Sequence, residues 1–350
     1  GWDEATLRRG LDRIANTPFD LAAGPLIRLH LYRRSDRTIL LLHTHHIVAD
    51  ATSIAIVVEQ MFEAYFALRA GQPVRWSRPA RSFAAHASTQ RKMLESQAGA
   101  AHRAFWREQL SEAPAVTTLP ADFPRPAGQR GPGASVNITV PKSLGRALGQ
   151  IAQEQGTTLF TLLLSAFNVF VHRLSGSTDQ VVGVPVGGRV KAEIEDCVGY
   201  LVNPLPIRTR IEDGLTFREL LAKSDVAVRG ALAHQDFPFA SMVRELDLAR
   251  DAIHSPIFQM MFAMERSAVI DSHGLAVTLL NTEGASITIQ DFKIEVVAVK
   301  RDRAQFDLTF VLEEFDGQIY GVIDYRTDLW RASTIEGFAS QFQLILQEVA

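Results

Sequence analysis

Apolar and polar positions follow two different periods along the chain, and the changes between them outline its secondary structure. Residues 26–33 and 38–44 are apolar-rich runs on either side of a polar tetrad, which predicts a β-hairpin. From Ser53 the apolar residues recur at helical spacing, which predicts a helix directly after the hairpin. A longer helical pattern covers about residues 83–110.

The stretch 113–133 changes in character, because proline occurs five times in it together with several glycines. Such a composition is typical of an irregular linker. We therefore predict an N-terminal lobe over residues 1–112, an inter-lobe linker over 113–133 and a C-terminal lobe over 134–350.

The predicted C-terminal lobe alternates between strand and helix patterns. One helix, capped by Thr157 and Thr158 and ending near Leu174, is apolar on all faces, which is typical of a core helix. The other elements are strands at 135–140, 181–185, 205–210, 258–264, 294–300, 307–313 and 318–325, and helices at 144–155, 216–234 and from 332 onward. This mixture predicts an α/β fold of the α+β sandwich kind in two unequal halves.

Composition narrows the function. Apolar residues make up 47% and charged residues 21% of the 350, and the formal net charge is -3 without charge blocks. This profile is typical of a soluble globular protein and disfavours nucleic-acid or membrane-surface binding as the main activity.

The single Cys197 excludes an internal disulfide and fits a reducing cytoplasm. No apolar run reaches the roughly 20 residues of a membrane span, and a helical pattern from the first residues indicates a start inside a domain.

The stretch 42–50 (LHTHHIVAD) holds three of the ten histidines and an aspartate between an apolar strand and an apolar helix. Each titratable group at a buried junction needs a partner or must stay uncharged. Imidazole also exchanges protons near neutral pH. Asp50 is well placed to cap the following helix. His45 and His46 are neighbours on the predicted strand, so they point to opposite faces and cannot both line one cavity, and one of them is a hydrogen-bonded core histidine.

Three other kinds of site fit this sequence poorly. His43 and His45 share a strand face, as zinc ligands do, but there is neither an H-E-x-x-H motif nor a cysteine pair, so we expect no metal. A Ser-His-Asp hydrolase lacks its G-x-S-x-G turn. Residues 187–189 (GGR) lack the layout of a phosphate-binding loop.

Residues 45–51 (HHIVADA) resemble the HHxxxDG signature of nonribosomal peptide synthetase condensation domains. Further segments resemble this family's motifs in the same order along the chain: 19–21, 24–26, 105–110, 119–120, 125–126, 198–203 (VGYLVN), 234–239 (HQDFPF), 250–251, 255–259 and 325–329. The chain departs from the family in two respects. The two most N-terminal motifs are absent, as in a truncated member, and Ala51 replaces the usual glycine.

The resemblance implies a chloramphenicol-acetyltransferase-like fold with two lobes in a V and an active-site tunnel between them. It implies an acyltransferase-type reaction in which an aminoacyl amine on one carrier protein attacks a donor thioester on another and forms a peptide bond. The partners are then donor and acceptor carrier proteins and a neighbouring adenylation domain. The substrates are attached to the 4'-phosphopantetheine of the partner carrier proteins, and the domain itself needs no cofactor, nucleic acid or membrane.

The resemblance also implies residue roles. His46 faces the tunnel and acts as general base or orients the amine, while His45 supports the loop. Asp50 forms a structural ion pair with Arg189, expected in the second lobe. Asn203 is a candidate tunnel-lining residue, or shapes a turn before its proline. No role is implied for His43.

Related functions remain as alternatives. Epimerisation relatives usually follow the signature with Ser-Trp, whereas residues 52–54 here are Thr-Ser-Ile. Heterocyclisation relatives replace the histidines with aspartates. An ester-forming member uses a hydroxyl acceptor. Docking relatives without chemistry usually lose the second histidine, which this chain keeps, although Ala51 leaves that alternative open.

Overall fold

The computed structural model describes residues 3–79, 81–114, 116–128, 131–189, 191–245, 253–265, 284, 286–289, 291–300 and 302–350. The chain folds as two compact units. Unit 1 comprises Gly1–Arg91, Gly187–Val202 and Ser267–Arg301, and unit 2 comprises Lys92–Val186, Asn203–Arg266 and Asp302–Ala350. This division differs from the predicted one. Residues 92–112 pack in unit 2, and two later segments return to unit 1, because contacts between distant parts of the chain decide membership.

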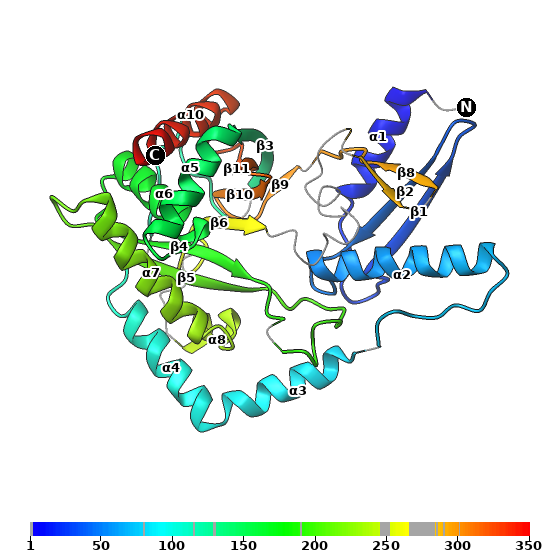
Figure 1. Ribbon diagram of the computed structural model, residues 1–350, viewed down its shortest axis with the longest axis horizontal. Coiled ribbons are helices and arrows are strands. Elements are labelled where there is room, and N and C mark those ends of the chain that lie inside the picture. The colour runs from blue at the N-terminus through cyan, green and yellow to red at the C-terminus, as the bar shows by residue number, and fades with distance from the viewer. Residues whose placement is uncertain are drawn as a thin grey trace. The chain divides into compact units, whose positions relative to one another are not determined.

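Unit 1 is built around the predicted hairpin, which the structure confirms. Its strands pair antiparallel, with Ile27 opposite Thr44 and Arg33 opposite Thr38. Leu7 and Leu11 of the first helix pack against Ile39 of the hairpin. The elements of this unit are α1 (Glu4–Ala15), β1 (Ile27–Arg33), β2 (Thr38–Thr44), α2 (Ala51–Arg69), most of α3 (Phe83–Leu94), β7 (Ser286–Ile289) and β8 (Phe292–Glu295) (Figure 1).

Two predictions about secondary structure are wrong. The helical pattern over 83–110 is two helices, α3 and α4 (Gln97–Leu110), because the Ser96 side chain accepts a hydrogen bond from the Gly99 N–H and starts a new helix. The strand predicted at 294–300 ends at Glu295 in β8, and residues 296–300 have no strand pairing. The predicted motif at 250–251 lies outside the described residues.

Unit 2 contains a seven-stranded mixed sheet in the order β5-β4-β6-β10-β11-β3-β9. Strand β6 runs parallel to both β4 and β10, whereas β5, β11, β3 and β9 pair antiparallel with their neighbours. The elements are α4, β3 (Gly131–Val140), α5 (Lys142–Glu154), α6 (Leu159–Ser175), β4 (Asp179–Val186), β5 (Asn203–Arg210), α7 (Phe217–Ala233), α8 (Phe239–Glu245), β6 (Met260–Glu265), β9 (Arg303–Ala304), β10 (Leu308–Phe315), β11 (Gln318–Arg326) and α10 (Ala332–Val349). The mixed α/β prediction is confirmed.

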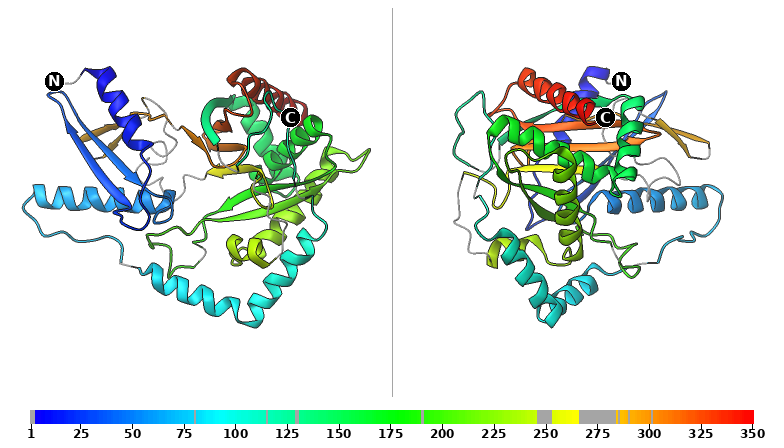
Figure 2. Two further views of the ribbon diagram at one scale, coloured as in Figure 1. Left: turned by 180° about the vertical axis from the view of Figure 1, so that it is seen from behind. Right: turned by 60° about the vertical axis from the view of Figure 1, so that its left-hand side comes forward.

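The core of unit 2 lies between this sheet and its helices. Figure 2 shows α5, α6 and α10 gathered beside the sheet. Helix α6 is buried along most of its length, and the Thr158 side chain caps it by accepting from the Thr161 N–H, as predicted. Its Phe167 and Phe170 contact Phe310 of β10 and Phe342 of α10. Each such buried phenylalanine contributes about 1.5–3 kcal/mol.

Helix α2 is long and apolar enough to cross a membrane by length and composition, and the bent pair α5–α6 passes the same test when taken together. A buried core helix passes this test too, and α6 is buried along most of its length. At its C-terminal end α2 packs within unit 1, where Tyr65 and Phe66 contact Phe292 of β8.

Candidate active site

The histidine cluster lies in a turn rather than on a strand. Strand β2 ends at Thr44, and residues 46–48 form a turn before the N-terminus of α2. The His45 N–H donates to the Leu26 carbonyl at 2.9 Å, and the Val48 N–H donates to the His45 carbonyl at 3.1 Å. The prediction that His45 and His46 point to opposite faces of a strand is therefore wrong, because neither residue belongs to the strand.

His46 is exposed, and the geometry fixes its tautomer. Its Nδ1 lies 2.7 Å from the Ala49 carbonyl oxygen. A carbonyl oxygen only accepts hydrogen bonds, so Nδ1 carries the hydrogen, and in the neutral ring Nε2 holds the lone pair. An imidazole of this form can accept a proton at Nε2. The His46 ring also meets the Tyr200 ring edge-on, with the two centroids 5.0 Å apart.

His45 and His43 are engaged in the surrounding structure. The Nδ1 of His45 accepts a hydrogen bond from the Ile47 N–H at 3.1 Å, which closes the turn. His43 is buried on β2 against Phe19, with ring centroids 4.2 Å apart. Burial, and then the charge of Arg28 and the proximity of His30, lower the pKa of His43. Support of a reaction by His45 stays a prediction.

Asp50 and Arg189 form the ion pair expected from the resemblance. The guanidinium donates from Nη1 to Oδ2 at 2.7 Å and from Nη2 to Oδ1 at 2.8 Å. The Ser53 and Leu201 N–H groups also donate to the carboxylate, which is only 1% exposed. Burial opposes ionisation of Asp50, but these hydrogen bonds outweigh it and lower its pKa. Since residues 187–202 belong to unit 1, the pair lies within one unit, and the expectation of a partner in the second lobe is corrected.

Ser53 extends this network to the segment 197–201. Its Oγ accepts from the Gly199 N–H at 3.0 Å and from Arg189 Nη2 at 2.9 Å. Its single hydroxyl hydrogen can reach Asp50 Oδ1 or the Gly199 carbonyl, both at 2.8 Å. The sequence analysis assigned no role to Ser53 or Tyr200, although Tyr200 lies in the VGYLVN motif, because only their contacts with distant residues give them a part in the site.

Ala51 is compatible with its place. It is the first residue of α2, and Asp50 is the N-cap, as predicted. Ala51 is not among the described non-glycine residues with positive φ, so the missing glycine causes no backbone strain. The departure of this chain from the HHxxxDG signature therefore leaves the local backbone intact.

Asn203, the predicted tunnel-lining residue, is the first residue of β5 in unit 2. Its Nδ2 donates to the carbonyls of Gln235 and Phe237, and its Oδ1 accepts from the Phe239 N–H, each at 2.8 Å. These bonds tie the HQDFPF segment to the sheet. The contact with a substrate stays a prediction.

His234 of the same segment packs on α4. Its Nδ1 lies 2.9 Å from Nδ1 of His102, its ring stacks on Phe105 at a centroid distance of 4.0 Å, and its carbonyl accepts from Trp106 Nε1. Burial, and then His102, lower the pKa of His234. These contacts agree with an architectural role for the segment.

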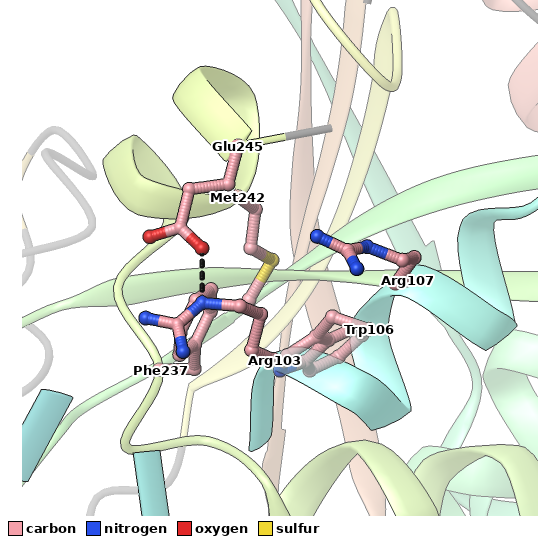
Figure 3. Close-up of a pocket in the computed structure, with 6 residues that line it drawn as sticks. All are labelled: Arg103, Trp106, Arg107, Phe237, Met242 and Glu245. Atoms are coloured by element: carbon pink, nitrogen blue, oxygen red, sulfur yellow. Dashed lines mark hydrogen bonds and ion pairs between the residues drawn. The ribbon is translucent and has the colours of Figure 1, made fainter. Parts of the chain in front are cut away.

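A small pocket lies between α4 and α8 (Figure 3). It is lined by Arg103, Trp106, Arg107, Phe237, Met242 and Glu245. Arg103 and Glu245 form an ion pair across it. The pocket contains none of the predicted site residues. Among the described residues, no group of three or more His, Cys, Asp or Glu side chains is arranged to hold a metal ion.

Comparison with known proteins agrees with the resemblance. The family model for the condensation domain matches residues 2–350. One of the linear gramicidin synthase proteins of Brevibacillus parabrevis is 36% identical over 347 residues, which cover 99% of this chain and 6% of that protein. Phosphinothricin tripeptide synthetase PhsC of Streptomyces viridochromogenes is 35% identical over 95% of this chain and 30% of its own length.

Solved structures show the same fold. A four-domain nonribosomal peptide synthetase bound to AMP and glycine superposes with a TM-score of 0.87 at 28% identity, over 99% of this chain and 26% of that one. The X-domain from teicoplanin biosynthesis gives a TM-score of 0.88 at 24% identity, over 99% of this chain and 77% of that one.

Fold, motif order and sequence similarity thus define a nonribosomal peptide synthetase type of domain. The chain belongs to the condensation-domain family, which confirms the predicted membership. It spans only a small part of the length of the synthetases it matches.

Proposed function

We propose that this domain forms a peptide bond between two carrier-bound substrates and that His46 carries the chemistry. The observation that supports this most directly is the hydrogen bond from His46 Nδ1 to the Ala49 carbonyl, which leaves the Nε2 lone pair available on an exposed ring. Family membership supports the reaction class, since condensation domains usually catalyse amide bond formation.

In the proposed reaction the acceptor's amine nitrogen attacks the carbonyl carbon of the donor thioester. A C–N bond forms, the C–S bond breaks, and the phosphopantetheine sulfur leaves with the electron pair. His46 Nε2 takes the proton from the amine and passes it to the leaving thiolate. Such general-base catalysis contributes about 10²–10⁴-fold, and alignment of amine and thioester contributes further.

The proposed partners are a donor and an acceptor carrier protein, each with a 4'-phosphopantetheine arm, and an adenylation domain in the same synthetase. The domain itself supplies side chains and no cofactor of its own. The V of two lobes and the tunnel between them, through which both arms would reach His46, stay predictions.

Retention of His46 and the unstrained Ala51 favour a catalytic domain over a docking module. The X-domain, whose fold is similar, is known in complex with OxyB from teicoplanin biosynthesis. Because of this structural similarity, docking of a partner protein without catalysis is the alternative that a test must distinguish from peptide-bond formation.

Intact-protein mass spectrometry of loaded donor and acceptor carrier proteins mixed with this domain tests the proposal. We expect the donor acyl mass to move to the acceptor carrier protein. Hydroxylamine treatment then separates the products, because it cleaves an ester between the two residues and leaves an amide intact. Absence of transfer by the folded domain within its full synthetase would contradict the proposal and favour docking.

A further inference from the structure

We infer that Tyr200 is a positioning residue for His46 and that the buried Asp50–Ser53–Arg189 network acts on the imidazole through Tyr200. This inference deepens the proposed function and rests on it, because it concerns the same histidine. Both residues and the whole network belong to unit 1.

The first support is the contact between the two rings. The centroids of His46 and Tyr200 are 5.0 Å apart, and the planes meet at 80°. Edge-to-face packing at this distance is a favoured arrangement of aromatic rings. The Ala49 carbonyl holds His46 Nδ1, but one hydrogen bond leaves the ring free to swing about it. Tyr200 restricts that swing, and so aims Nε2.

The second support is the way in which Tyr200 itself is held. The residue before it, Gly199, has both its N–H and its carbonyl within hydrogen-bond distance of the Ser53 hydroxyl. The residue after it, Leu201, donates its N–H to Asp50 Oδ2 at 3.0 Å. Tyr200 is thus fixed on both sides by side chains at the start of α2, the helix that follows the His46 turn.

The backbone of this segment packs closely against its neighbours at two glycines. Gly188 has a φ of +68°, and a Cβ there would lie 2.1 Å from the Leu201 carbonyl oxygen. A Cβ on Gly199 would lie 2.2 Å from the Phe83 ring. Neither position therefore accepts a side chain without movement. The glycines let the segment approach its neighbours closely enough for Ser53 and Asp50 to hold it.

The ring of Tyr200, not its hydroxyl, is expected to matter. Burial, and to a lesser degree the nearby charge of Asp50, raise the pKa of Tyr200, so the phenol stays neutral. A phenylalanine keeps the edge-on contact and a leucine removes it. This difference gives the test its matched pair of variants.

Steady-state transfer between loaded carrier proteins, measured with Tyr200→Phe, Tyr200→Leu and Tyr320→Leu, tests the inference. Tyr320 lies on β11 and is 42% exposed, so it controls for the loss of a tyrosine. We expect Tyr200→Leu to lower kcat by roughly 10- to 100-fold with KM changed less than about twofold, since misplacement of a reacting group costs rate. Tyr200→Phe and Tyr320→Leu keep the wild-type kcat. A wild-type kcat in Tyr200→Leu would overturn the inference.

The path through Tyr200 is tested by combining variants. Ser53→Ala removes the bonds to Gly199 and is expected to lower kcat in the wild-type background. It should cost much less when added to Tyr200→Leu, because residues that act as a unit are not additive. Fully additive losses would mean that Ser53 acts on the reaction by another route.

Nuclear magnetic resonance of ¹⁵N-histidine-labelled protein reads the same contact without turnover. The His46 signals are assigned by their absence in His46→Ala. Tyr200→Leu should shift the His46 ring protons, and Tyr200→Phe should shift them much less. If the wild-type protein transfers no acyl group, the proposed function is contradicted, but the inference about Tyr200 is not. The spectrum still shows whether Tyr200 contacts the His46 ring. Unchanged His46 signals in Tyr200→Leu would contradict the positioning role.

Discussion

Two residues of the segment 45–51, His46 and Asp50, contrast in how they use their polar atoms. His46 is exposed, and its one described hydrogen bond leaves Nε2 with a free lone pair. Asp50, four residues later, is 1% exposed, and both its oxygens accept hydrogen bonds from Arg189 and from backbone N–H groups. A group that reacts must keep an atom available, whereas the Asp50 carboxylate, which builds the site, has both its oxygens engaged.

The largest effect expected from this contrast concerns Asp50. Asp50→Ala leaves the guanidinium of Arg189, whose side chain is 9% exposed, without its countercharge. Breaking a buried ion pair in this way costs about 3–5 kcal/mol of unfolding free energy. Urea unfolding measures the loss.

Arg210→Ala is the matched control for the reciprocal variant Arg189→Ala, because the exposed Arg210 pair should contribute less than about 1 kcal/mol. Equal losses of unfolding free energy in Arg189→Ala and Arg210→Ala would contradict the claim that the buried pair stabilises the site.

Asn203 extends the contrast to unit 2, where a polar side chain is again engaged on both its polar atoms. Asn203→Ala leaves two carbonyls and one N–H without their partner, which should cost about 2–3 kcal/mol. Thermal unfolding measures it, with the exposed Asn137→Ala as a control expected to change stability by less than about 0.5 kcal/mol. If Asn203→Ala is as stable as the wild type, the structural role is contradicted and substrate contact is the only role left for this residue.

The smallest effect concerns the histidine pair His102–His234. A hydrogen bond between two Nδ1 atoms needs one donor and one acceptor, so a second proton disrupts it. The pKa of His234 is lowered in the folded state, so the unfolded state binds the proton more readily. The contribution of the neutral His234 to the unfolding free energy is therefore complete above about pH 6.5. It falls as the pH drops below that value, by at most about 1.4 kcal/mol per pH unit for one proton. Melting temperatures from pH 7.5 to 5.5 should fall less in His234→Gln than in the wild type. Equal pH dependence would exclude this pair as the cause.

Much of the fold could be predicted because local patterns determine it. The hairpin, the core helix α6 with its Thr158 cap, and the Asp50 cap of α2 each depend on neighbouring residues. The break at Ser96 was missed because an N-cap serine inside a continuous helical pattern gives little periodic signal. The division into units was missed because residues 187–202 join unit 1 through contacts with residues more than 130 positions earlier.

The candidate site was predicted only in part. The pairing of Asp50 with Arg189 came from the family resemblance, and the structure contains it. Tyr200 lies inside the VGYLVN motif, but the sequence does not say which residue it contacts, and Ser53 lies in no motif, so only the fold brings them beside His46 and Asp50. The turn at His45 and His46 was misjudged because an apolar strand pattern does not mark where pairing stops.

The most direct test of the role proposed for His46 is a paired measurement on His46→Gln, namely single-turnover transfer between loaded carrier proteins and urea unfolding of the same protein. Glutamine can still donate to the Ala49 carbonyl but offers no basic nitrogen. We predict a loss of rate of about 10²–10⁴-fold, with unfolding free energy within about 0.5 kcal/mol of the wild type. Wild-type transfer by a stably folded His46→Gln would contradict the claim that this imidazole carries the reaction.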